Sequence, residues 1–219
     1  MKGWVLTKRL DEDAIARLLM AKLRRSPQRK ETFHFLEFAM KNAAILMFLA
    51  LAGAVAAQEN VDRQIIESLR ALPEALRAEA TVFGYDESDD RVLLREGSNG
   101  ITCWADDPKP NLDEPFYVLC FPKSLEQFLV RNDELKRQGI VDRAAVLEKE
   151  IESGKILMPE FDIRYTLRGK RFEEAMALTI IHVPYATAEE TGFSAEVDNY
   201  RPWLMLEGTP FAHIMIPGH

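Results

Sequence analysis

The chain has 219 residues, with 28 Lys and Arg against 35 Asp and Glu, and a formal net charge of −7. Residues 1–57 carry a net charge of +5, which leaves −12 on residues 58–219. Because a surplus of negative charge repels phosphate backbones, this balance excludes nucleic acid as the main partner. No internal repeat or low-complexity tract is present, and residues 58–219 have the length of a single domain.

An apolar run, AAILMFLALAGAVAA, occupies residues 43–57 and contains no charged residue. It is fifteen residues long, whereas a membrane-spanning helix needs about 20. Met40-Lys41 provide a positive start and Ala54-Val55-Ala56 a small-residue exit. The pattern predicts a signal peptide over residues 40–57, cleaved after Ala56 or Ala57. We therefore expect a periplasmic or extracellular protein that meets the membrane only through this leader.

The position of the leader, forty residues into the chain, has two explanations. Met40 is the real start and residues 1–39 are an upstream extension outside the real protein, or the long N-terminus is real and the apolar segment is retained as an anchor. The fit of Met40-Lys41 to a short positive segment favours the first explanation.

The stretch after the leader predicts a helical segment followed by strands. Ile65, Leu69 and Leu72 recur at helical spacing, and Pro73 breaks the run and can begin a second short helix. Strands are predicted over 81–85, 92–95 and 101–104. The acidic run at 86–90 begins like a calcium loop, but Arg91 stands where such a loop needs Gly, which excludes it.

Two features are predicted to shape this strand region. Asn99-Gly100 indicates a type I′ turn that joins the second and third strands as a hairpin. Cys103 lies on the third strand and Cys120 on a fourth, predicted over 116–121. In an exported protein such a pair favours a disulfide, which stabilises the fold by about 3 kcal/mol in the loop-entropy model. The alternative is two buried free thiols.

The remaining elements complete an α+β fold. Ser124 to Gln127 match a capping box that begins a helix ending near Gly139, and a second helix is predicted over 142–153. Strands follow over 162–167 and 177–183, and two more flank residues 208–210. The sequence therefore predicts a mainly antiparallel sheet with an N-terminal helical segment and a central helical hairpin, in one domain over 58–219.

Four segments together resemble an uncharacterised family of bacterial exported proteins. They are LLREGSNGITCWADDP, KSLEQFLVRNDELKRQGI, VPYATAEETG and PWLMLEGTPFAHIMI. The resemblance runs from about Ala71 to Pro217 and includes none of residues 1–39. It implies export and a start at Met40, and it carries over no activity, cofactor or catalytic residue.

Histidines are the main candidates for chemistry. His182 and His213 lie on predicted strands among apolar residues. With a carboxylate from Glu189 or Glu190, they could hold a metal or transfer protons, although their separation in sequence matches no ligand motif. The alternative for each is a histidine hydrogen-bonded inside the sheet. No nucleophile elbow, phosphate loop or dinucleotide glycine pattern is present, so no cofactor is expected.

The long connection over 184–201 and the tryptophan that follows it supply the other candidates. Tyr185, Glu190 and Trp203 combine aromatic rings with a carboxylate, as ligand sites do, or they cover the edge of the core. We expect a non-catalytic module that binds a small molecule or a protein. The alternative is a hydrolase or metal-dependent enzyme that uses His182 and His213 with a nearby carboxylate.

Overall fold

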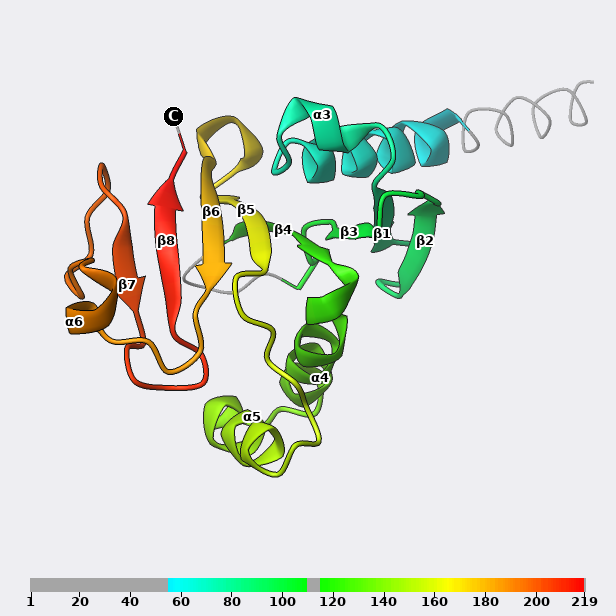
Figure 1. The fold of residues 1–219 in the computed structure, drawn as a ribbon. Coiled ribbons are helices and arrows are strands. Elements are labelled where there is room, and N and C mark those ends of the chain that lie inside the picture. The colour runs from blue at the N-terminus through cyan, green and yellow to red at the C-terminus, as the bar shows by residue number, and fades with distance from the viewer. Residues whose placement is uncertain (1–54, 110–114, 219) are drawn as a thin grey trace, which may run out of the picture. The chain divides into compact units, whose positions relative to one another are not determined.

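The computed structural model describes residues 55–109 and 115–218 (Figure 1). The chain divides between Ala57 and Gln58, and residues 58–219 form one unit. The predicted upstream extension (1–39) and nearly all of the predicted signal peptide (40–57) lie outside the described residues, so both stay predictions. Within the described ranges, no helix has the length and hydrophobicity needed to cross a membrane.

An eight-stranded sheet organises the unit, in the order β2-β1-β3-β4-β5-β6-β8-β7. Its neighbours pair antiparallel except β1 and β3, which are parallel. The strands are β1 (Thr81–Tyr85), β2 (Arg91–Arg95), β3 (Ile101–Trp104), β4 (Phe116–Pro122), β5 (Ile163–Gly169), β6 (Met176–His182), β7 (Trp203–Met205) and β8 (His213–Pro217). The predicted α+β class with a mainly antiparallel sheet is confirmed.

Helices lie between and before these strands. Residues 58–69 are helical and precede the sheet. The other helical segments are α3 (Glu74–Arg77), η1 (Lys123–Leu125), α4 (Glu126–Arg137), α5 (Arg143–Glu152), η2 (Phe172–Glu174) and α6 (Ala188–Thr191).

The predicted hairpin at Asn99-Gly100 is wrong. β2 and β3 lie on opposite edges of β1, so the chain crosses the start of β1 instead of turning back on itself. Gly97 makes the crossing possible, because a Cβ there would lie 2.3 Å from the Glu79 carbonyl oxygen. Gly100 has a φ of 74°, but Asn99 has no positive φ, as a type I′ turn requires. The Asn99 side chain instead donates to the Leu76 carbonyl at 2.9 Å.

One face of the sheet is covered by the helical segment before it. Val118 and Cys120 of β4 pack there with Leu72 and with partly buried Leu69. The predicted disulfide is present, since Cys103 and Cys120 are register partners on β3 and β4 and are bonded to each other. This predicted pairing is thus confirmed, and it lies in a fully buried layer.

The other face is covered by α4 and α5. Leu119 and Phe121 alternate with the residues above and pack against Leu129 of α4 and Leu147 of α5. Figure 1 shows α4 and α5 next to each other and away from α3. The predicted capping box is wrong: Ser124 lies within η1, Leu125 takes the N-cap position, and no side chain caps the helix. The Ser124 hydroxyl instead contacts the Asp162 carboxylate.

Candidate functional site

The two candidate histidines lie side by side at the end of a strand pair. His182 of β6 and His213 of β8 are register partners, and their ring centroids are 6.0 Å apart. Both side chains are buried, although 31 residues of sequence separate them. Antiparallel pairing of β6 and β8 therefore brings together two residues whose spacing alone indicates no site.

A cavity of about 340 Å³ opens over these imidazoles. Phe128 of α4, Leu147 of α5 and Phe211 form apolar parts of its wall. The Phe128 ring stands edge-on to His182 at 6.4 Å and lies 5.9 Å from the Phe211 ring. An apolar chamber with a few convergent polar groups is typical of small-molecule sites, and its volume is at the lower end of their range.

His182 is a buried polar group without a partner. Only 2% of its surface is exposed, and neither ring nitrogen has a hydrogen-bond partner. Burial, the positive charge of Arg164 and the neighbouring His213 lower its pKa to about 3. The ring is therefore neutral at physiological pH. Since native proteins rarely leave buried polar atoms unpaired, the unpaired nitrogens need an explanation such as a ligand or an ordered water.

A hydrogen bond to the backbone just before β8 holds His213 in one tautomer. Its Nδ1 lies 2.7 Å from the Phe211 carbonyl oxygen, and since a carbonyl only accepts, Nδ1 carries the proton. Burial lowers its pKa, and the bond to Phe211 opposes that shift in part. A neutral His213 therefore keeps an acceptor lone pair on Nε2.

Two arginines in the cavity wall lack an ionic partner. Arg164 of β5 and Arg143 at the start of α5 both line the cavity. The Arg164 Nε is buried without a hydrogen-bond partner, and Arg143 makes one contact, from Nε to Asn132 Oδ1 at 3.3 Å. Neither forms an ion pair with any residue of the described ranges. No pattern in the sequence marks Arg143, and the one signal for Arg164 is an arginine at an inward position of a predicted strand.

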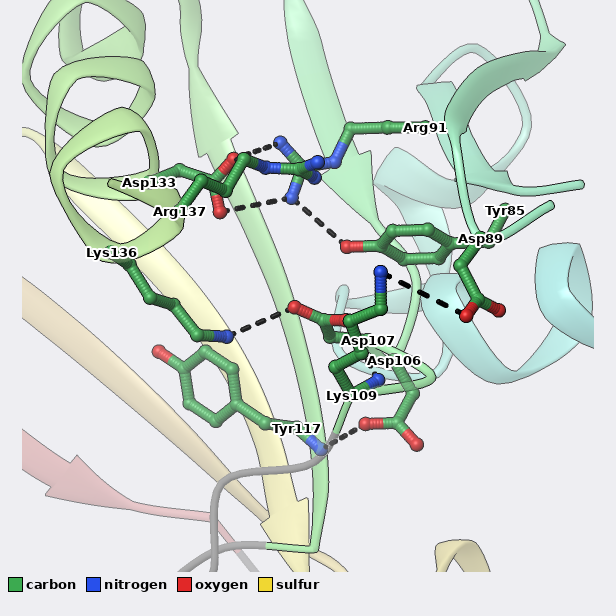
Figure 2. Close-up of polar contacts among 10 residues, drawn as sticks. All are labelled: Tyr85, Asp89, Arg91, Asp106, Asp107, Lys109, Tyr117, Asp133, Lys136 and Arg137. Atoms are coloured by element: carbon green, nitrogen blue, oxygen red, sulfur yellow. Dashed lines mark hydrogen bonds and ion pairs between the residues drawn. The ribbon is translucent and has the colours of Figure 1, made fainter. Parts of the chain in front are cut away.

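A second cavity, of about 270 Å³, adjoins the first and shares Asn132, Arg143 and Arg164 with it. Arg91 of β2 lies in the wall of this second cavity, and Figure 2 shows its guanidinium directed at Asp133. The Arg91 guanidinium donates to both carboxylate oxygens of Asp133, at 2.9 and 3.3 Å, and lies 4.0 Å from the Trp104 ring. A bidentate pair stacked on an aromatic face fixes the orientation of both side chains.

Lys136, Asp106 and Asp107 of this second cavity also have polar partners. Lys136 donates to Asp107 at 2.9 Å, and Asp106 accepts from the Tyr117 amide at 2.8 Å (Figure 2). Burial raises the pKa of Asp106. Burial acts the same way on Asp107, but hydrogen bonds from Lys109 and Lys136 outweigh it and lower the pKa of Asp107. Arg143 and Arg164 are thus the cations of the two cavities that have no carboxylate partner within the described chain.

The remaining candidates from the sequence lie away from both cavities. Tyr185 is about half exposed and has a φ of 63°. Glu190 caps its own helix: it accepts from the Thr187 amide at 2.9 Å, and these bonds lower its pKa. Trp203 is buried against Met215 and its neighbours, with an unpartnered Nε1. The structure therefore brings His182 and His213 together but does not bring Tyr185, Glu190 or Trp203 to the cavity they share.

No cluster of three His, Cys, Asp or Glu side chains with metal-ligand geometry occurs in residues 55–109 and 115–218. Asp142 is the one carboxylate lining the histidine cavity among those residues, and its side chain accepts from the Ala145 amide at 3.1 Å as the N-cap of α5. Glu190, named with the histidines in the sequence, caps α6 instead.

Comparison with known proteins finds no matching family model, no matching curated protein and no matching solved structure. The resemblance to bacterial exported proteins therefore stays a prediction, and the function must be argued from the geometry of the cavities.

Proposed function

We propose that the protein is an exported, non-catalytic binding module that takes a small molecule into the histidine cavity between the sheet and helices α4 and α5. The observation that carries the proposal is His182, a buried imidazole in the wall of a largely apolar cavity, both of whose nitrogens lack a hydrogen-bond partner. A ligand with one donor or acceptor at this point would satisfy a polar group that the chain leaves unsatisfied.

Export is supported by the buried disulfide, because such bonds persist in oxidising compartments. A periplasmic or extracellular protein meets small molecules before they enter the cell, which suits a binding role. The measurement is the N-terminal sequence of the protein recovered outside the cytoplasm. We expect it to begin at Ala57 or Gln58, and an intact Met1 on exported protein would contradict the proposal.

A screen with a blocked cavity tests binding itself. The full chain is exposed to a library of small organic molecules, and binding is detected as a rise in Tm. Ala144 of α5 lines the cavity and is exposed, so a larger side chain there is tolerated by the fold. Ala144→Leu narrows the cavity and should abolish the rise in Tm for molecules that bind inside it. Lys149→Leu, on the same helix but outside the cavity wall, is the matched control and should leave the rise unchanged. Compounds that raise the Tm of Ala144→Leu as much as that of the parent would refute the proposed site.

The alternative function is a hydrolase or metal-dependent enzyme, and one observation favours it: both imidazoles line the same cavity. His213 Nε2 is the available base, whereas neutral His182 has no proton to give as an imidazolium at physiological pH. The test is turnover of an ester and amide panel, with and without added zinc. Turnover that disappears in His213→Asn while binding persists would establish the enzyme and overturn the binding module.

A further inference from the structure

We infer that the ligand is a small organic carboxylate, whose carboxylate group is bound by Arg143 and Arg164 and whose apolar body lies along Phe128 and Phe211. This inference rests on the proposed function, because it names the chemical class of the molecule that occupies the same cavity. It is carried by three features: two guanidinium groups without a carboxylate partner in the described ranges, their place where the two cavities meet, and the apolar wall on one side of them.

The charge pattern points to a missing anion. Arg91 pairs with Asp133, and Lys136 pairs with Asp107, so the chain provides carboxylates for cations where it needs them. Arg143 and Arg164 have no such partner within the described ranges, although residues 58–219 carry a net charge of −12. A buried or partly buried cation without a counter-ion is unfavourable, and an anionic ligand is what removes that penalty.

The donor geometry fits a carboxylate. A guanidinium presents a planar fork of N–H donors that matches the two oxygens of a carboxylate. Asn132 lines both cavities, and since its Oδ1 already accepts from Arg143, its amide nitrogen is left as an uncharged donor. The N-terminus of helix α5 lies in the same wall, but the Asp142 carboxylate already caps it, so the positive charge offered to a ligand comes from the two guanidinium groups.

The surroundings limit how much negative charge the ligand can carry. Asp106, Asp107 and Asp133 line the second cavity and Asp142 lines the first, so a dianion or a ligand with a second acidic group would meet like charges. On the histidine side the wall is apolar, with Phe128, Leu147 and Phe211. A single carboxylate on a short aromatic or aliphatic body therefore matches both the charge and the shape.

Matched pairs of probes test the inference on the full chain. Phenylacetate and hexanoate are titrated by calorimetry beside the neutral phenylacetamide and hexanamide, with phenyl phosphate as the dianion. We expect the carboxylates to bind at least tenfold more tightly than the amides and the phosphate. Arg164→Gln and Arg143→Gln should each weaken carboxylate binding at least tenfold, while Arg164→Lys, which keeps the charge without the fork, should lose less. Arg70→Gln, at an exposed position in the turn directly after the N-terminal helical segment, removes the same charge and should change nothing.

Each other outcome has a distinct meaning. Amides that bind as tightly as carboxylates, with both blocked by Ala144→Leu, would overturn the inference and leave the proposed function standing. Tighter binding of phenyl phosphate would overturn the carboxylate in favour of a phosphate ester. Failure of every probe would overturn the inference alone, because the library screen decides the proposed function separately. Circular dichroism of each variant establishes that a loss of binding is not a loss of folding.

Discussion

Replacement of His182 by Phe should make the protein less sensitive to mild acid. The pKa of His182 in the folded chain is about 3, against 6.5 for an ordinary histidine. Between pH 3 and pH 6.5, His182 is therefore protonated in the unfolded chain and neutral in the folded chain. The contribution of neutral His182 to the free energy of unfolding is therefore fully present above pH 6.5, and it is lost progressively as the pH falls toward 3. At pH 5 the loss amounts to about 2 kcal/mol, since each unit below 6.5 contributes about 1.4 kcal/mol.

The other charged and titratable groups of the same cavity remain in the variant: Arg164 from β5, His213 from β8, and Asp142 and Arg143 at the start of α5. Urea unfolding at pH 7.5 and pH 5.0 gives the free energy of unfolding of both proteins. The parent should lose about 2 kcal/mol more than His182→Phe between the two conditions. Equal losses in the two proteins would refute the reasoning, because they would show that His182 titrates as an exposed histidine does.

Three further perturbations test the framework by urea unfolding. Joint replacement of Cys103 and Cys120 by Ala should lower the free energy of unfolding by about 3 kcal/mol, and a change below about 1 kcal/mol would argue against a stabilising cross-link. Arg91→Met should cost about 2 kcal/mol because it leaves the largely buried Asp133 with only the half-exposed Arg137 as its ion-pair partner, whereas Arg137→Met leaves the buried Arg91 pair in place and should cost under about 1 kcal/mol. Gly97→Ala should cost about 2 kcal/mol because its methyl group would overlap the backbone at the start of β1, and a neutral effect would contradict the chain crossing there.

Local patterns predicted the strands but not their order. Alternating and β-branched segments placed all eight strands, because these signals depend on the residues themselves. The Asn99-Gly100 step gave a wrong prediction, because β2 and β3 each pair with β1 and not with each other. The same two residues therefore belong to a connection that crosses β1. The disulfide was predictable because a single loop joins β3 and β4, and antiparallel pairing of the two strands aligns Cys103 with Cys120.

The sequence predicts the two histidines of the site but not its two arginines. The chain has four histidines in all, so the sequence alone marks His182 and His213 as candidates, although it does not predict that they pair. Arg143 and Arg164 do not stand out in the sequence among 28 Lys and Arg, because what distinguishes them is that no carboxylate of the described ranges lies close enough to pair with them. Glu190 misled for the opposite reason: its carboxylate is already occupied by its own helix N-terminus.

The disulfide and the second cavity lie on opposite faces of the strand pair β3 and β4. Trp104 and Leu119, next to the cysteines in sequence and register partners of each other, point to the opposite face and line the second cavity. The Trp104 ring supports Arg91, which in turn holds Asp133 of α4. Because a one-residue slip between β3 and β4 would turn Trp104 away from the cavity, the cross-link fixes the wall of the site as well as the core. Loss of the disulfide is therefore expected to weaken ligand binding even at temperatures where the protein stays folded, which calorimetry on the double Ala variant measures.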